Sequence, residues 1–515
     1  MHGLQTLDYI VVAVYLLALL AVCLRVIRRA PDADELFLAG RSLGWGVIGL
    51  SLFASNISST TLIGLPGAAW QSGIAVANYE WMAAVVLVVS LVFVVPLFIG
   101  NRLATVPELL ERRFDHRLRK YLSAVSVVLG IFLDAAGSLY AGALVLQVFF
   151  PALTLQISCA AIAVFAGLYT AAGGLRAVAY TDVLQALVLL AGSLVMSVIL
   201  FGEFDYSWQK VVAAVPEDRL SLLRPLDDPT LPWLGTVIGL PILGFYYWTM
   251  NQYVAQRLLG ARDLQAAGWG AILAAVLKLL PLFLMVLPGV MAGALLTDLV
   301  RPDEVFPRMV AEYAPAGIAG LILAGLLAAI MSSVDSALNS SSTLLTLDFI
   351  QPHRPDMTVA QLGNLGRWLT LILVAVAAIW APAINDFPGL FMYLQEGFTY
   401  AASPLVATFL MALFALGISA TPALIGTAAG HLFSIAWLAA TRAELVDLHF
   451  TVVAGVLLAF TVAAITLAQA LIGGRPAAAQ LAVVDRLQTP APSKPLLWAS
   501  ATVLALTGLL VLVFR

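Results

Sequence analysis

The chain has 515 residues, of which 62% are hydrophobic and only 11% are charged, and its net charge is -3. Soluble domains carry about 25% charged residues, so this composition excludes an ordinary water-soluble protein. The small net charge gives no sign of nucleic-acid binding. Because a membrane span needs ~20 mostly apolar residues, the chain has room for well over ten spans.

Fourteen apolar segments follow one another along the chain, and we expect each of them to span the membrane. They are 7–26, 44–69, 76–99, 120–149, 151–172, 177–202, 232–256, 267–296, 314–348, 363–382, 388–416, 420–440, 449–472 and 496–514. Arginine and lysine gather in every second connecting loop, for example Arg176 after the fifth segment and Arg257 after the seventh. By the positive-inside rule these loops face the cytoplasm, so we expect both termini to lie outside.

The second apolar segment is interrupted by the polar stretch SNISSTT at residues 55–61, and the seventh by GFYYWTMNQY at 244–253. Polar groups left unpaired in hydrocarbon cost several kcal/mol, so such stretches indicate broken helices that line a cavity or bind a ligand. They open two blocks of five spans, 44–202 and 232–416. Since five is an odd number, the second block enters the membrane inverted. Interrupted helices at corresponding positions of inverted halves are typical of secondary transporters, whose cargo binds where the halves meet.

Five ionisable residues fall inside predicted spans. They are Glu80, Asp134, Asp182, Lys278 and Asp335. A charge at this depth is costly and marks either a partner or an aqueous cavity. A paired structural charge is the alternative for each residue, and for Asp134 the sequence does not decide between the two.

The ninth segment contains the serine-rich run MSSVDSALNSSS at residues 331–342. At helical spacing, one face collects Ser332, Ser336, Asn339 and Ser340. Close packing of small residues against other helices is one explanation of this face. The other is cation binding, because sodium needs several oxygens to replace its hydration shell, and a broken helix supplies bare carbonyls. We therefore expect a sodium site where residues 54–61 face residues 329–336.

Seven sequence markers occur in a fixed order along residues 7 to 470. They are FASNIS, YEWM, GGLRAVAYTDVLQ, YYWTMNQYVAQR, LKLLPLFLMVLPG, MSSVDSALNSSSTLLTLD and YLQE. In this order they resemble the sodium/solute symporters, especially the sodium–sugar (glucose/galactose) branch and its bacterial members. The resemblance implies an all-α polytopic membrane protein with about 14 transmembrane helices in a LeuT-like inverted five-plus-five repeat, located in the bacterial inner membrane.

The resemblance also divides a single transporter domain, 1–515, into four parts. They are an extra N-terminal helix (7–29), a first repeat (44–202), a second repeat (232–416) and peripheral C-terminal helices (420–515). The expected partners are a small solute and membrane lipid, and the sequence does not indicate an oligomeric state.

The resemblance implies that sodium is the coupling ion, at one site or at two. The principal site would consist of the backbone carbonyls of Ala54, Ile57 and Ala329 and the hydroxyls of Ser332 and Ser333. The second site, found in some members, would consist of Ser332, Asp182, Asp335 and Ser336. Asp335 stands where those members often carry a hydroxyl, so it binds either sodium or a proton. The sequence favours two ions over one.

The resemblance further implies a sugar site. Its hydrogen-bonding residues would be Asn56, Glu80, Lys278 and Gln395, with Tyr79 beside Glu80, and Tyr247 as an aromatic inner gate next to Trp248. Thr61 is the eighth predicted substrate-binding residue. Thr61, Ala83 and Gly244 stand where the galactose-transporting member has a glutamine, a serine and an asparagine. Missing polar groups change which hydroxyl pattern fits, so we expect a sugar or sugar-like polyol without naming it.

Other functions compete with this hypothesis. The same fold could carry an amino acid, a carboxylate or a vitamin-like solute, coupled to sodium or to protons. Glu80 disfavours an anion, although Lys278 weakens that argument. An enzyme is disfavoured because the sequence has no His/Cys metal-ligand cluster, no GxSxG motif and no phosphate loop. A sensor is disfavoured because the last predicted span ends directly before Arg515, and no repeated filter sequence suggests a channel.

Overall fold

The computed structural model describes residues 5–27, 37–150, 152–485 and 489–515. Within these ranges, ten helices are long and apolar enough to cross a membrane, and two shorter apolar helices, Thr6–Val22 and Leu155–Gly167, accompany them. The regular elements of the described residues are helices, joined at one point by an isolated β-bridge between Leu43 and Ala261. An all-helical polytopic protein is therefore confirmed.

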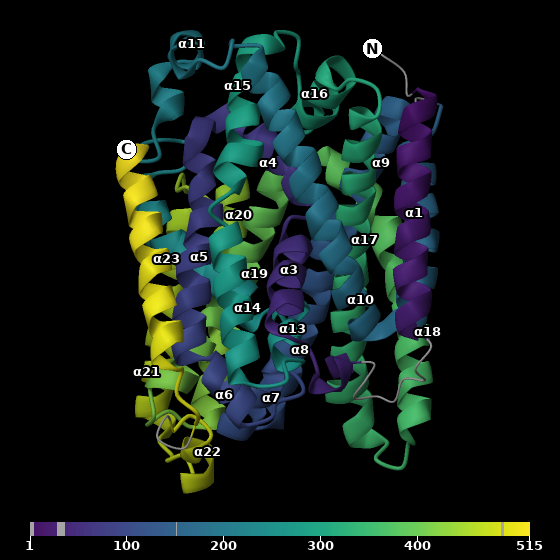
Figure 1. Cartoon of the computed structure of the whole chain (residues 1–515). Coiled ribbons are helices and arrows are strands. Elements are labelled where there is room, and N and C mark those ends of the chain that lie inside the picture. Colours follow the sequence, from purple (N-terminus) through teal and green to yellow (C-terminus); the bar gives the residue numbers. More distant parts are fainter. Residues whose placement is uncertain (1–4, 28–36, 151, 486–488) are drawn as a thin grey trace.

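The α-helices form one bundle, and most of them run along its long axis (Figure 1). In chain order they begin with α1 (Thr6–Ile27), α3 (Trp45–Asn56), α4 (Ser59–Ser72), α5 (Ala77–Phe93), α6 (Val95–Gly100), α7 (Val106–Arg113), α8 (His116–Leu129), α9 (Ala136–Phe149), α10 (Leu155–Gly202), α11 (Trp208–Ala214) and α12 (Leu240–Phe245). They continue with α13 (Gln252–Leu259), α14 (Leu264–Leu277), α15 (Leu287–Leu295), α16 (Val305–Tyr313), α17 (Ile318–Leu344), α18 (Val359–Trp380), α19 (Leu390–Phe414), α20 (Ala420–Arg442), α21 (Phe450–Ile472), α22 (Ala478–Ala482) and α23 (Lys494–Val513). Short 3-10 segments connect them: η1 (Ala39–Arg41), η2 (Gly73–Val76), η4 (Glu217–Leu220), η8 (Pro302–Glu304), η10 (Gln351–His353) and η11 (Ala381–Asp386).

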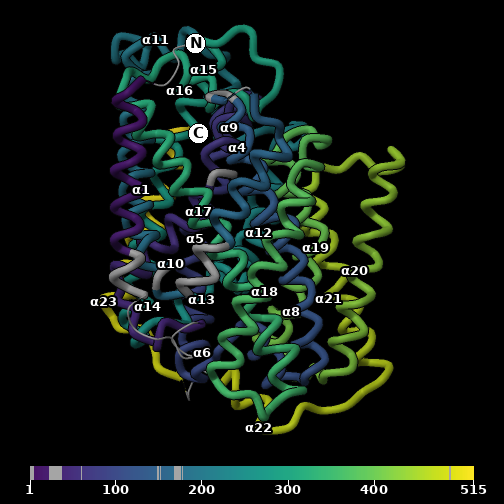
Figure 2. Tube along the Cα trace, turned by 90° about the vertical axis from the view of Figure 1, so that its right-hand side faces the viewer, coloured from purple at the N-terminus to yellow at the C-terminus, as the bar shows by residue number. Residues whose placement is uncertain are grey.

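The bundle has a buried centre and a peripheral layer. Helix α17 packs against α10, α3, α13 and α4, and nearly all of its residues are buried. Helices α20 and α21 pack on α19 at the far side of the bundle (Figure 2). Helix α1 begins, and α23 ends, toward the end of the bundle at which α11 and α16 lie (Figure 1).

The predicted break in the second apolar segment is present. Helix α3 ends at Asn56, and the backbone of Ile57 leaves the helical region with ψ 70°. Ser58 is extended and caps α4, since its side chain accepts a hydrogen bond from the Thr61 amide at 3.3 Å. The side chains of Ser59 and Thr60, which we expect to satisfy freed backbone groups, lie outside the described part.

The predicted break in the seventh segment is also present. Helix α12 continues as a π-helical segment, η6 (Tyr246–Met250), and the chain then becomes extended at Asn251. The Asn251 side chain caps α13 by accepting from the Tyr253 amide at 3.0 Å. Both predicted interruptions are therefore short non-helical links between two helices, and in each a polar side chain caps the N-terminus of the second helix.

Two predicted spans share one long helical element. Residues 155–172 and 177–202 of the fifth and sixth apolar segments belong to α10, which has 48 residues. A straight helix of this length would measure ~72 Å, against ~30 Å for the hydrocarbon layer, so α10 holds both predicted spans. Its two halves have different neighbours, because Cys159 contacts the Leu139 carbonyl of α9, whereas Ser197 donates to the Phe283 carbonyl at 2.6 Å.

Five π-helical segments occur among the described residues. They are η3 (Gly130–Ala135), η5 (Gly235–Gly239), η6 (Tyr246–Met250), η7 (Leu282–Val286) and η9 (Leu345–Ile350). Such segments are rare and are frequent at functional sites. Two of them carry residues of interest from the sequence, since Asp134 lies on η3 and Tyr247 on η6.

Candidate functional site

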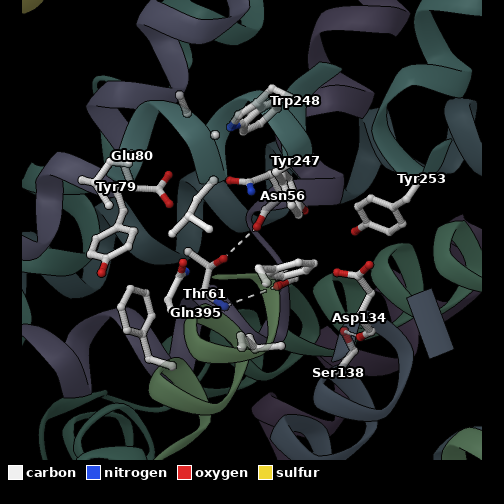
Figure 3. Close-up of a pocket in the computed structure, with 18 residues that line it drawn as sticks. Asn56, Thr61, Tyr79, Glu80, Asp134, Ser138, Tyr247, Trp248, Tyr253 and Gln395 are labelled. Atoms are coloured by element: carbon white, nitrogen blue, oxygen red, sulfur yellow. Dashed lines mark hydrogen bonds between the residues drawn. The ribbon is translucent and has the colours of Figure 1, made fainter. Parts of the chain in front are cut away.

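A polar cavity of about 110 Å³ lies beside both helix breaks (Figure 3). Its polar lining comprises Asn56, Ser58, Thr61, Tyr79, Glu80, Asp134, Ser138, Tyr247, Trp248, Tyr253 and Gln395. Its apolar lining comprises Ala83, Leu240, Leu243, Gly244, Phe391, Leu394 and Phe398. The cavity therefore draws on both predicted repeats, as a site between two halves requires.

The structure brings seven of the eight predicted substrate residues to this one cavity. They are Asn56, Thr61, Tyr79, Glu80, Tyr247, Trp248 and Gln395. The eighth, Lys278, is fully buried behind the lining. Its ammonium group donates to the Glu80 carboxylate and to the Asn56 side-chain oxygen, and lies 5.2 Å from the centre of the Trp248 ring.

Lys278 has two partners within the protein. We expected it to bind a sugar hydroxyl, whereas its ammonium is engaged by Glu80 and Asn56. The Glu80–Lys278 ion pair compensates the charge of the carboxylate, so Glu80 can face the cavity without an external cation. In this arrangement Lys278 orients two lining residues.

Thr61, Ala83 and Gly244, which are less polar than their counterparts in the galactose-transporting member, all line the cavity. Ala83 and Gly244 present no side-chain hydrogen-bonding group, and the Thr61 hydroxyl donates within the protein, to the Asn56 carbonyl at 2.7 Å. At these three positions the cavity wall therefore offers the cargo fewer hydrogen-bonding groups than the residues of the galactose-transporting member would.

An aromatic group closes one side of the cavity. The Tyr247 ring lies 5.3 Å from that of Trp248, 6.1 Å from Tyr253 and 6.0 Å from Phe398. Across the lining, Tyr79 meets Phe391 edge to face at 5.0 Å. Such geometry is favourable between aromatic rings and offers flat apolar faces to a ring-shaped solute.

The end of α3 supplies the carbonyls of the first predicted sodium site. Backbone bonding of α3 ends with the Ile57 amide on the Phe53 carbonyl at 2.8 Å, and resumes in α4 with the Leu62 amide on the Ser58 carbonyl at 2.9 Å. The last carbonyls of a helix have no partner within the helix. Among those released here, Ser55 accepts from the Tyr253 hydroxyl and Asn56 from Thr61. Ala54 and Ile57, the two predicted carbonyl ligands, are both fully buried.

Helix α17 supplies the other half of that site. It packs directly against α3 and α4, and Ala329, Ser332 and Ser333 are buried on it. The Ser333 hydroxyl donates to the Ala329 carbonyl at 2.8 Å, and the Ser332 hydroxyl donates to Asp182 at 2.5 Å. Backbone carbonyls and hydroxyl oxygens are hard ligands that suit sodium, so the oxygen atoms of these residues are suitable ligands for the ion.

The second predicted site contains a cation that the sequence did not reveal. The Arg257 guanidinium, 1% exposed, donates to Asp182 at 3.0 Å, to Ser336 at 2.5 Å and to Ser51 at 2.7 Å. Ser51 also donates to Asp182. Asp182 therefore receives bonds from α3, α13 and α17, and its charge is compensated inside the protein.

Sequence reasoning placed Arg257 in a cytoplasmic loop because the apolar segment ended one residue earlier. It lies instead on α13, the second half of the broken helix, all of which is buried. The polar interruption at residues 244–253 could have predicted this position, because the half-helix that follows a break can turn toward the centre of the protein and bury its polar residues there. Asp335, the remaining member of the predicted second site, is fully buried on α17 directly before Ser336.

The open question about Asp134 is resolved in part by its position. It lines the cavity from η3, is 8% exposed, and stands on the side opposite Glu80 and Tyr79 (Figure 3). The Asn251 amide approaches its carboxylate at 3.5 Å, the outer limit of a hydrogen bond. Asp134 is therefore a cavity residue that a resemblance to the sugar-binding positions did not identify.

Comparison with known proteins bears on this arrangement. Residues 36–430 match the model of the sodium:solute symporter family. The chain belongs to this family. A sodium/glucose cotransporter of Vibrio parahaemolyticus is 34% identical in an alignment 468 positions long, which covers 84% of this chain and 85% of the relative. Sodium/glucose cotransporter 1 of Oryctolagus cuniculus is 34% identical in an alignment 471 positions long, which covers 83% of this chain and 71% of the relative.

Solved structures of low sequence identity share the fold of this symporter. The substrate-bound outward-open state of a Na⁺-coupled sialic acid symporter has a TM-score of 0.80 at 22% identity and covers 92% of this chain and 99% of that one. A nucleobase-cation-symport-1 family transporter in a closed conformation has a TM-score of 0.58 at 16% identity and covers 89% and 99%. The predicted family is thus confirmed, and the chain is a multi-pass membrane transporter rather than an enzyme.

Proposed function

We propose that this symporter imports a sugar or sugar-like polyol by alternating access, driven by sodium. The observation that carries the proposal is the gathering of seven predicted sugar-site residues around one polar cavity beside two broken helices. The relatives named above are sodium/glucose cotransporters, which supports a sugar as the cargo.

The chemistry of the lining suits a solute rich in hydroxyls. The side chains of Asn56 and Gln395 both donate and accept, Glu80 accepts, and Tyr247 and Trp248 offer flat apolar faces. Sugars present alternating donors and acceptors on a ring whose faces are apolar. Because Lys278 already neutralises Glu80, that side of the cavity needs no charge from the cargo.

The proposed location of the first sodium site supports coupling between sodium and cargo. An ion held by Ala54, Ile57, Ala329, Ser332 and Ser333 would join the α3–α4 break to α17, next to the cavity wall formed by Asn56. Sodium binding would thus favour the arrangement in which cargo binds. Each ion that enters down ~100 mV contributes about 2.3 kcal/mol, which is roughly fifty-fold accumulation.

A second sodium ion at Asp182, Asp335, Ser332 and Ser336 forms part of the proposal on one condition. The Arg257 guanidinium bonds to both Asp182 and Ser336, so sodium enters only when this guanidinium withdraws. Two cations on one buried carboxylate would repel each other at contact distance. The proposed stoichiometry of two therefore requires a state in which the Arg257 guanidinium has left Asp182 and Ser336.

The membrane arrangement that we propose has about 14 spans, an inverted five-plus-five repeat, and both termini outside the bacterial inner membrane. Two matching helix breaks, at Ile57–Ser58 and at Asn251, support the inverted repeat. The start of α1 and the end of α23 lie toward the same end of the bundle, which supports an even number of crossings.

Uptake into proteoliposomes tests the proposal. The purified symporter should accumulate at least one labelled solute from a panel of D-glucose, D-galactose, D-mannose, an amino acid and a dicarboxylate, only under an inward sodium gradient. Sodium-independent uptake would contradict the coupling. Sodium-driven uptake of the amino acid or the dicarboxylate, with no sugar transported, would replace the sugar by the alternative cargo.

A further inference from the structure

Asp134 is a buried carboxylate that the proposed function does not use. It lines the cavity from the π-helical segment η3, and only 8% of the residue is exposed. Figure 3 shows its carboxylate directed into the cavity, on the side opposite Glu80. A buried carboxylate without a strong partner is costly, and a group that enters the cavity can provide the missing partner.

The protein supplies Asp134 with little compensation. Its hydrogen-bonding neighbour among the described side chains is the neutral Asn251 amide, at 3.5 Å. That amide is itself fixed, because its oxygen caps α13 at the Tyr253 backbone. At the outer limit of hydrogen bonding, one neutral amide does not replace the water that a carboxylate loses on burial. Most of the acceptor capacity of Asp134 is therefore left for a ligand.

The two charged lining residues of the cavity differ in this respect. Glu80 forms an ion pair with Lys278, whereas Asp134 faces Asn251, Ser138 and Tyr253. The site thus has a neutralised side and a negative side. An anionic cargo would be repelled at the negative side, and a hydrogen-bond donor would be attracted there.

We propose that Asp134 is a cargo-binding carboxylate, which accepts a hydrogen bond from a hydroxyl or a protonated amine of the solute and excludes a carboxylate at that position. The inference rests on the proposed function and deepens it, because it names a recognition element on the second side of the cavity. Hydroxyl and ammonium donors share the chemistry that a carboxylate recognises, and uptake of matched solutes distinguishes them.

The test compares Asp134→Asn with the unaltered symporter in proteoliposomes. The probes are the panel sugar with the largest sodium-driven uptake, its amino-sugar analogue and its uronic-acid analogue. Loss of one hydrogen bond to a charged group should raise the concentration for half-maximal uptake about tenfold for the neutral sugar. An equal rise for the amino sugar identifies a hydroxyl as the donor, and a larger rise identifies the ammonium. Uptake of the uronic acid should increase relative to the neutral sugar.

Two controls separate binding from folding. Asp298→Asn removes an exposed carboxylate, paired with Arg308 at 3.1 Å outside the cavity, and should leave uptake unchanged. Asp134→Glu keeps the charge and moves it by one methylene, so it should fold and still discriminate against the uronic acid, even if Asp134→Asn is unstable.

Each outcome bears on a different claim. If Asp134→Asn transports all three probes with unaltered half-saturation and selectivity, the carboxylate is structural and the inference is wrong. If the unaltered symporter shows no sodium-driven sugar uptake, the proposed function fails. Sodium-driven uptake of the uronic acid in preference to the neutral sugar by the unaltered protein would contradict the exclusion of anions.

Discussion

Two buried aspartates in this symporter have the same chemistry and opposite surroundings. Asp182 accepts from the Arg257 guanidinium at 3.0 Å and from Ser332 at 2.5 Å, and also from Ser51. Asp134 is approached by one neutral amide at 3.5 Å. The charge of Asp182 is thus satisfied by the protein, whereas that of Asp134 is left to a ligand. Burial alone does not identify a binding residue, because the identity of its partners decides its role.

The short helix α13 connects the two environments. Asn251, which approaches Asp134, caps its beginning, and Arg257, which pairs with Asp182, lies near its end. Six residues of helix separate them, a rise of ~9 Å. A displacement of α13 would therefore change the cargo-facing carboxylate and the internal ion pair together, which gives alternating access a specific moving element.

The comparison predicts that changes around Asp182 affect stability and that changes around the cavity affect cargo affinity. Arg257→Met should have the largest effect, because it leaves a buried charge uncompensated at a cost of about 3–5 kcal/mol. We expect a large fall in the thermal unfolding temperature in detergent, together with loss of uptake.

The double variant Asp182→Asn/Arg257→Met removes both charges and serves as the control for the ion pair. It should recover much of the lost stability, since no unpaired charge remains. If Arg257→Met were as stable as the unaltered protein, the internal compensation of Asp182 would not matter and the comparison would fail.

Ser333→Ala tests the first sodium site. The Ser333 hydroxyl donates to Ala329 within α17, so its loss should cost little stability. Removal of one ligand of a charged ion should raise the sodium concentration for half-maximal uptake about tenfold. Ser340→Ala is the matched control, because its hydroxyl bonds to the Ala337 carbonyl of the same helix outside the predicted site. Unchanged sodium dependence in Ser333→Ala would remove Ser333 from the site.

Gln395→Ala tests the cavity side of the comparison. Gln395 lines the cavity on α19, and its amide offers both a donor and an acceptor to the cargo. Its loss should weaken sugar binding by about 1 kcal/mol, roughly fivefold, and leave the unfolding temperature unaltered. A fall in stability without a change in half-saturation would show that Gln395 is structural.

Thr61→Gln should have the smallest effect and should alter selectivity. Thr61 lines the cavity near Gln395 (Figure 3), and its hydroxyl donates a hydrogen bond to the Asn56 backbone carbonyl. A longer amide at this position adds hydrogen-bonding groups to the wall. We expect the ratio of galactose to glucose uptake to change by roughly twofold, about 0.5 kcal/mol, and an unaltered ratio would show that position 61 does not face the hydroxyls that differ.

Much of this arrangement could be predicted from the sequence. The two helix breaks followed from polar residues inside apolar segments, because such residues have few solutions in a membrane. The residues around the cavity followed from the resemblance to sodium–sugar symporters. The same resemblance assigned Lys278 to the cargo, and it does not show that Glu80 and Asn56 also accept hydrogen bonds from this ammonium.

The remaining features depend on geometry that hydropathy does not report. Arg257 lay just beyond an apolar segment and was interpreted as a loop residue, because a hydropathy pattern does not show that a half-helix turns inward. Asp134 remained undecided because the direction of its side chain depends on the π-helical segment η3, which helical periodicity does not anticipate.

The π-helical segments make the lining of the cavity sensitive to the number of residues in the helices that carry it. A π segment behaves as a helix with one residue inserted, so deletion of that residue restores an ordinary helix. Each deleted residue rotates the helix beyond it by ~100°. Asp134 on η3 and Tyr247 on η6 would both turn away from the cavity after such deletions. Single-residue insertions and deletions in these helices would therefore change which side chains line the cavity.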